Sequence, residues 1–186
     1  MRHNGDEDIL SFSNAQKVFS FLVEDARKEF LASEIQKAAG LSKAGVYRAL
    51  NELVRRELVK KEERGRFVLY SAAADDCMVR QFKVLKTVTA LKKLVQKLKA
   101  SSRKIVLFGS AARGEDYKDS DLDLLIVAKD PEAAHKSVSN FKSGRHIQPV
   151  IKTSVQLSEM EAGSKEFFNE INSGIVLWEE TDEPRV

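Results

Sequence analysis

Two short groups of residues in the second half of the chain have the types and spacing that bind phosphates and metal ions. Gly109 and Ser110 follow one apolar stretch, and Asp121 and Asp123 lie at the start of another. A glycine lets the backbone approach a ligand closely, and the free N–H groups at a helix start, together with a serine hydroxyl, bind phosphate oxygens. We therefore expect Gly109 and Ser110 to contact the phosphate oxygens of a ligand.

The two aspartates predict a metal ion. Residues two apart on a strand point to the same face, so the carboxylates of Asp121 and Asp123 repel each other. A strand with a buried body does not tolerate such a pair without compensation. Mg²⁺ or Mn²⁺ supplies it, because these ions bind carboxylates together with substrate phosphates and neutralise charge during phosphoryl-type transfer. Asp121 and Asp123 are thus predicted metal ligands and catalytic residues; the alternative is that they only cap a loop.

The segment that contains both groups, LFGSAARGEDYKDSDLDLLIV at 107–127, resembles the polymerase-beta-like nucleotidyltransferase superfamily, especially its minimal members. The resemblance implies that the chain binds a nucleoside triphosphate, first of all ATP. It assigns the triphosphate to Gly109 and Ser110, and the metal to Asp121 and Asp123. Further positions of the connecting loop match the family and imply proximity to the phosphates: Arg113, Gly114 and Ser120.

One expected feature of an active member is missing. A third carboxylate belongs on a neighbouring strand, but the stretch 145–151 reads RHIQPVI and Gln148 takes that position. An amide is no general base at neutral pH and a poor Mg²⁺ ligand. His146 points to the same face, and is either a substitute base or a solvent-exposed strand-end histidine. Pro149 indicates an edge strand or a bulge.

The elements around these residues alternate between strand and helix. This alternation predicts an α/β (α+β) domain with a small mixed sheet flanked by helices. Strands are expected at Lys104–Phe108, Leu122–Ala128, Arg145–Ile151 and Ile175–Trp178. Helices are expected from Ser110 and over Pro131–Lys142 and Ser164–Asn172.

A long basic helix is predicted over residues 75–100, ahead of this domain. Its apolar positions recur at alternating spacings of four and three, at Val84, Val88, Leu91, Val95 and Leu98, widened by Leu85 and Leu94. Such a face packs by default against a neighbouring part of the protein. The alternative is a seam between two copies of the chain in a homodimer.

The first part of the chain has the element order of a winged helix. Asn14, Ser33 and Ser42 are expected helix starts, Gly40 ends the second helix, and the third runs to about Glu57. Strands follow at 58–60 and 67–70, with the turn at 62–66 around Gly65. The segment 33–70 is similar to winged helix-turn-helix DNA-binding domains. We therefore expect a DNA-binding domain at 1–74 and a nucleotidyltransferase-like domain at 75–186.

The predicted DNA contacts are polar, basic or aromatic side chains that reach phosphates and base edges. Most lie on the third helix, opposite its apolar face, and two arginines flank the hairpin tip. An ordinary solvated basic face is the alternative. The predicted set is Lys43, Tyr47, Arg48, Asn51, Arg55, Arg64 and Arg66.

Charge and composition agree with two parts of different character. The formal net charge is +3, but it divides into +2 over 1–74, +7 over 75–104 and −6 over 105–186. This asymmetry indicates a part that faces nucleic acid joined to an acidic part. The single cysteine, Cys77, excludes an internal disulfide and a cysteine-based zinc cluster, and fits a cytoplasmic protein. No apolar run is long enough to predict a membrane span.

Three functions remain open from the sequence. The first is Mg²⁺-dependent transfer of a nucleoside monophosphate to a hydroxyl group. The second is a transcriptional regulator whose degenerate nucleotidyltransferase-like domain only senses nucleotide. The third, implied by the resemblance alone, is an antitoxin that neutralises a toxin-like protein partner. We favour the first for the chemistry and the second for the biological setting, and the fusion resembles an arrangement that recurs in prokaryotic proteins.

Overall fold

The computed structural model describes residues 13–163 and 165–181. The chain forms two compact units, residues 1–83 and 84–186. The boundary between them falls inside helix α4, Cys77–Leu98, which a short 3₁₀ turn, Lys99–Ser101, continues. Within the described residues, no helix is both long and apolar enough to cross a membrane.

Ahead of α4, the described part of the first unit contains three helices: α1 at Asn14–Glu24, α2 at Ala32–Ala39 and α3 at Lys43–Arg55. The predicted cap at Asn14 is wrong by one residue. The hydroxyl of Ser13 accepts from the backbone N–H of Gln16 at 3.1 Å, and the Gln16 side chain accepts from the N–H of Ser13 at 2.8 Å. This reciprocal pair satisfies two free N–H groups and so fixes the start of α1.

The start and end of α3 follow from its flanking residues. Ser42 caps it through the N–H of Gly45 at 3.2 Å, and Gly40, with φ 64°, ends the preceding helix, as predicted. α3 stops at Arg55, before the expected Glu57, because Glu57 has a φ of 61°. A residue with positive φ does not continue a right-handed helix.

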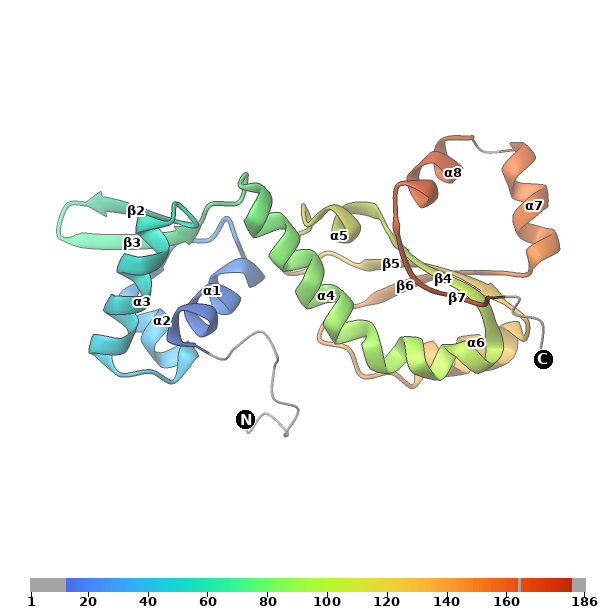
Figure 1. Ribbon diagram of the computed structural model, residues 1–186, viewed down its shortest axis with the longest axis horizontal. Coiled ribbons are helices and arrows are strands. Elements are labelled where there is room, and N and C mark those ends of the chain that lie inside the picture. Colours follow the sequence, from blue (N-terminus) through green and yellow to red (C-terminus); the bar gives the residue numbers. More distant parts are fainter. Residues whose placement is uncertain (1–12, 164, 182–186) are drawn as a thin grey trace. The chain divides into compact units, whose positions relative to one another are not determined.

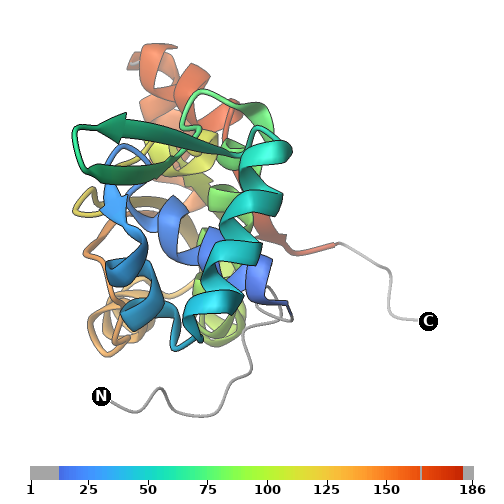
Figure 2. The same ribbon diagram turned by 90° about the vertical axis from the view of Figure 1, so that its left-hand side faces the viewer.

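A three-stranded antiparallel sheet completes the first unit. Its order is β1–β3–β2, with β1 at Phe30–Leu31, β2 at Val59–Arg64 and β3 at Phe67–Ala72. The β2–β3 hairpin turns at Gly65, which has a φ of 61°. β1 was not expected, because two residues are too few to show a strand period. The helices and this hairpin, seen together in Figure 2, confirm the predicted winged helix.

The second unit contains a four-stranded sheet of order β6–β5–β4–β7. Its strands are β4 at Ser102–Phe108, β5 at Leu122–Ala128, β6 at Ile147–Lys152 and β7 at Ile175–Glu179. β5 pairs antiparallel with β4 and parallel with β6, so the sheet is mixed, as predicted. β6 lies at the edge, where a proline is tolerated because one side of the strand needs no partner. This position confirms the expectation from Pro149.

Helices cover both faces of this sheet (Figure 1). Residues of α4, including Leu91 and Leu94, and Ala134 of α6, Pro131–Ser139, belong to the core on one face. On the other face, Phe167 and Ile171 of α8, Lys165–Asn172, pack with α7, Ser154–Gly163. The predicted packing of the apolar α4 face is therefore confirmed for its second half, whereas Leu85 is exposed. α7 was not predicted, and Ser164 lies outside the described residues.

Candidate functional site

The turn after β4 directly contacts a carboxylate of β5. Gly109 opens α5, a short helix at Gly109–Arg113, and has a φ of 71°. A Cβ atom at this position would lie 2.5 Å from Oδ2 of Asp123. The β4–β5 register explains the closeness, since Phe108 pairs with Asp123. Only glycine meets both requirements here, the positive φ and the close approach.

The two aspartates lie in different surroundings, and only Asp123 belongs to the strand on which both were expected. Asp121 precedes β5 and has a side chain 44% exposed, whereas Asp123 lies within β5 and is partly buried. Burial raises the pKa of Asp123, the carboxylates of Asp121 and Glu170 raise it further, and the Arg145 guanidinium opposes them. Ionisation of Asp123 beside the Gly109 turn therefore costs more free energy than ionisation of a solvated aspartate.

A divalent cation fits this donor set. Two neighbouring carboxylates plus phosphate oxygens are a common environment for Mg²⁺, and a cation would relieve the repulsion at Asp123. Among the described residues, no three His, Cys, Asp or Glu side chains form a group that could hold a metal alone. The ion would therefore need ligands beyond Asp121 and Asp123, and the phosphates of a nucleotide are suited to supply them.

Gln148 and His146 both lie beside the two aspartates. In the parallel β5–β6 register, Gln148 pairs with Asp123, and the carbonyl of His146 accepts from the N–H of Leu122 at 2.9 Å. Gln148 is exposed and stands where the acid was expected. His146 Nδ1 lies 3.2 Å from Oδ1 of Asp121, and its side chain is 73% exposed. His146 is therefore both a solvent-exposed histidine and a neighbour of the proposed metal ligand.

Arg113 and Ser120 form contacts with neighbouring residues of the second unit. The Nε of Arg113 donates to Glu115 at 2.9 Å, and its Nη1 lies 3.6 Å from Oε1 of Glu170. Both carboxylates raise the pKa of Arg113, Glu115 first through its hydrogen bond. The Ser120 hydroxyl accepts from the N–H of Tyr117 at 2.9 Å. Their contact with a nucleotide stays a prediction, and Glu170, on α8, is an acid near this site that the sequence did not single out.

The sequence also missed Arg145. Its Nη1 donates to Oδ2 of Asp116 at 2.5 Å, its Nε to the carbonyl of Ser120 at 2.9 Å, and its Nη2 to the carbonyl of Asp121 at 3.4 Å. The Asp116 side chain is only 4% exposed. An arginine before an edge strand and an acid in a loop follow no sequence period, so nothing in the sequence indicated this pair.

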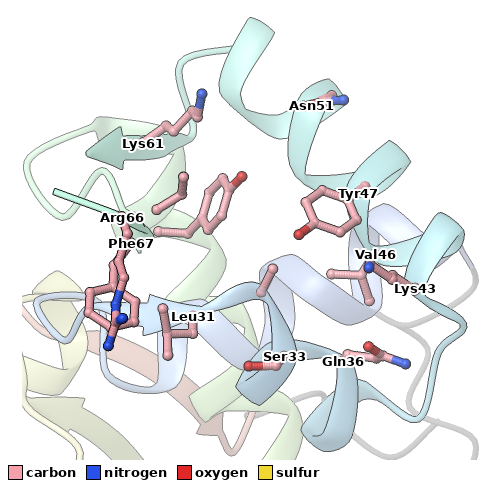
Figure 3. A pocket seen from close by; sticks show the side chains of 13 residues that line it. Leu31, Ser33, Gln36, Lys43, Val46, Tyr47, Asn51, Lys61, Arg66 and Phe67 are labelled. Carbon is pink, nitrogen blue, oxygen red and sulfur yellow. The ribbon is translucent and has the colours of Figure 1, made fainter. Parts of the chain in front are cut away.

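In the first unit, four of the predicted DNA contacts line one pocket of about 530 Å³. Lys43, Tyr47 and Asn51 lie on the α3 side, four residues apart along one line of the helix, and Arg66 lies on the hairpin side (Figure 3). Lys61, which pairs with Glu63 at 2.6 Å, lies on the hairpin side as well. The lining contains no acidic residue, so the pocket suits an anion.

The other three predicted contacts lie outside this pocket lining. Arg48 and Arg55 are exposed on a neighbouring line of α3. Arg64 forms a double hydrogen bond with Glu29, at 2.8 and 2.9 Å, and a second one with Glu62 at the same two distances. Two carboxylates thus occupy the guanidinium of Arg64. The role of Arg64 in DNA binding stays a prediction. Its contact with Glu29, 35 positions away in the sequence, is visible only in the tertiary structure.

Two family models match this chain. Residues 89–183 match the polymerase beta nucleotidyltransferase model. Residues 13–74 match the model of TrmB, a sugar-specific transcriptional regulator. Both matches confirm the two resemblances expected from the sequence. No curated protein sequence matches the chain.

The similar solved structures include a protein described as a nucleotidyltransferase and proteins described as binding DNA. A Sulfolobus solfataricus protein described as a nucleotidyltransferase is 15% identical; the match covers 54% of this chain and 86% of that one, with a TM-score of 0.38. Lactococcus lactis ZitR in complex with DNA is 24% identical over 44% of this chain and 60% of ZitR, with a TM-score of 0.34. TrmBL2, an archaeal chromatin protein, is 15% identical over 86% and 70%, with a TM-score of 0.30.

Proposed function

The chain belongs to the polymerase beta nucleotidyltransferase family, and from this premise we propose that it binds a nucleoside triphosphate with a divalent metal ion. It would transfer the nucleoside monophosphate to a hydroxyl acceptor and release pyrophosphate. One observation supports the proposal above all. The carboxylate of Asp123 lies against the Gly109 turn, with Asp121 two residues away. This arrangement joins a backbone suited to phosphates with a pair of carboxylates suited to a cation.

Each residue has a separate task in this proposal. Asp121 and Asp123 hold Mg²⁺ or Mn²⁺, which when bound neutralises charge on the phosphates. Gly109 and Ser110 bring backbone and hydroxyl groups to the triphosphate, with ATP the first nucleotide to test. His146 is the candidate base in place of the missing acid. Because its Nδ1 contacts Asp121, Nε2 is the atom that would take the proton of the acceptor hydroxyl.

We further propose that the winged helix binds DNA. The TrmB family match and the pocket without acidic lining residues support this. Lys43 on the α3 wall and Arg66 on the hairpin wall provide charge, and Tyr47 and Asn51 on the α3 wall provide hydrogen-bonding groups. These side-chain types contact phosphates and base edges. The exposed Arg48 and Arg55 extend the surface along α3.

Titration calorimetry with Mg²⁺–ATP and Mn²⁺–ATP tests the ligand. The wild type should bind, and the double change Asp121→Asn, Asp123→Asn should lower the affinity by about 100-fold or more, since it removes both charged ligands. Asp119→Asn is the matched control, because it removes an exposed carboxylate from the same loop. Absence of heat with either metal and any of the four common nucleoside triphosphates would refute the proposal.

Transfer itself needs a separate measurement. Wild-type protein incubated with α-labelled ATP, Mg²⁺ and a cell extract should label an acceptor, whereas Asp121→Asn, Asp123→Asn should not. Binding without any labelled acceptor would leave a nucleotide-binding protein that performs no transfer. Changing His146 to Gln should reduce labelling without preventing ATP binding if its Nε2 acts as the base.

A second candidate function is a nucleotide-sensing transcriptional regulator. Gln148 favours it, because the residue paired with Asp123 on β6 is an amide that can neither accept a proton nor hold Mg²⁺ well. Gel shifts on DNA upstream of the coding region, with and without Mg²⁺–ATP, test the idea. DNA binding that is insensitive to ATP and to Arg48→Ala would count against it. If Gln148→Asp creates label transfer that the wild type lacks, the sensing function is favoured.

A further inference from the structure

The loop between the Gly109 turn and the aspartates is held at two places. At its start, Gly114 has a φ of 70° and the N–H of Glu115 donates to the carbonyl of Ser110 at 3.0 Å. This bond ties the loop to α5. At its end, the only described side chain that donates to the carbonyls of Ser120 and Asp121 is that of Arg145. Arg145 thus holds the chain entering β5 together with the backbone hydrogen bond from the N–H of Leu122 to the carbonyl of His146.

Arg145 is suited to this task by its position and chemistry. It stands two residues before β6, and β6 runs parallel beside β5, so it lies next to the loop end. The guanidinium is planar and donates in several fixed directions, which lets it bind one carboxylate and two carbonyls at once. Its side chain is 21% exposed, and its carboxylate partner Asp116 is almost fully buried. The interaction is therefore largely shielded from water.

We propose that Arg145 is a positioning residue of the metal and nucleotide site: its guanidinium fixes the peptide groups just before β5 and so sets the direction of the two carboxylates, Asp121 and Asp123. The inference rests on the proposed binding of metal and nucleotide. The hydrogen bonds of Arg145 go to a side chain and two carbonyls of the protein, and its charge also lowers the pKa of Asp123. Arg145→Lys, which keeps the charge, is therefore the variant that isolates the positioning role. Outer residues that orient metal ligands commonly change metal affinity by about 10- to 100-fold when replaced.

The first test replaces Arg145 by Lys, which keeps the charge but loses the planar arrangement of donors. Binding of Mn²⁺ with ATP is followed by the free Mn²⁺ signal in electron paramagnetic resonance, at a temperature where all variants are folded. We expect Arg145→Lys to bind roughly tenfold more weakly or worse. The control is Arg103→Lys, an exposed arginine of the same unit, 3.8 Å from Glu180, which should bind as the wild type does.

A second variant separates positioning from stability. Arg145→Gln alone leaves the buried Asp116 carboxylate without its guanidinium partner, so it should melt at a lower temperature. The double change Arg145→Gln, Asp116→Asn removes the buried charge as well and should restore much of the melting temperature. It does not restore the donors to the carbonyls of Ser120 and Asp121, so Mn²⁺–ATP affinity should stay low. If Arg145→Gln does not fold, the double variant and Arg145→Lys still give the result.

The outcomes separate the two proposals. Wild-type affinity in Arg145→Lys, or recovery of affinity together with stability in the double variant, would overturn the positioning role and leave the proposed function standing. A wild type that binds no Mn²⁺–ATP would overturn both. Weak binding by both variants in a stable fold is the result that the proposal requires.

Discussion

The two candidate sites distribute charge in opposite ways. In the first unit, Arg64 is neutralised by Glu29 and Glu62, but no acidic residue lines the pocket beside Lys43 and Arg66. In the second unit, Asp123 lies against the Gly109 turn with Asp121 two residues away, and burial raises the pKa of Asp123. Each site leaves one sign of charge incompletely compensated, positive in the first unit and negative in the second.

This difference indicates which ligand completes each site. A protein surface compensates most of its charges with nearby opposite ones, and Arg64 shows that this chain does so on its hairpin. Charges left without such partners are where a ligand of opposite sign gains most. The winged helix therefore suits the phosphates of DNA, and the second unit suits a divalent cation.

The largest effect is expected from Gly109→Ala. The added Cβ would lie 2.5 Å from Asp123 Oδ2, and the alanine would have to keep the backbone φ of 71°. We expect a loss of about 2–4 kcal/mol in the free energy of unfolding and no measurable binding of Mg²⁺–ATP. Gly40→Ala is the control, with a φ of 64° and open space around the Cβ position, and should cost only about 1 kcal/mol. Urea denaturation followed by circular dichroism measures both.

The next effect compares two arginines of one hairpin. Arg66→Ala should weaken DNA binding by about tenfold and reduce the salt dependence of the affinity by about one phosphate contact. Arg64→Ala should change either quantity little, because Glu29 and Glu62 already hold that guanidinium. Fluorescence anisotropy over a salt series makes the comparison. Equal losses of DNA affinity in the two variants would mean that Arg64 leaves Glu29 and Glu62 when DNA binds.

A smaller effect concerns pH and Asp123. Its pKa in the folded protein is raised above the usual 3.8, so the folded state holds this proton more tightly than the unfolded state. The contribution of this group to stability is therefore greatest below pH 3.8 and is lost as the pH rises through its folded pKa. Without metal, Asp123→Asn should stabilise the second unit at neutral pH and reduce this part of the pH dependence. Unfolding followed by the fluorescence of Trp178, the single tryptophan, gives the measurement.

Asp121→Asn provides the corresponding control. It too removes repulsion from Asp123, but it leaves the Asp123 carboxylate able to titrate. A pH dependence that is the same in the wild type and in Asp123→Asn would show that this carboxylate is compensated in solution. The contrast between the two units would then disappear.

The smallest effect is expected from Glu29→Gln. The change removes one carboxylate from Arg64 and makes the hairpin more positive. DNA affinity should rise about two- to threefold, since exposed ion pairs are individually weak. Arg64→Ala added to Glu29→Gln should cancel most of the gain in DNA affinity if the Arg64 guanidinium, held then by Glu62 alone, causes that gain. Unchanged affinity in Glu29→Gln would place Arg64 outside the DNA surface altogether.

Much of the local structure could be predicted from the sequence. β5 has the predicted bounds, Gly40 and Ser42 end and cap their helices, and Gly65 turns the hairpin. These features depend on neighbours in the chain, through caps, glycine conformations and apolar periods. The two-residue β1 and α7 were missed, because one is too short and the other has no clear apolar face.

The sequence by itself determined two modules and which residue types could hold phosphate, metal and DNA, because these depend on chemistry and short spacings. The tertiary structure alone decided which of those residues meet. It placed Gln148 beside Asp123 through a parallel register, brought Glu29 across 35 positions to Arg64, and set Arg145 on the loop before β5. Such pairings arise where strands and loops distant along the chain are packed together, and no local period of the sequence records them.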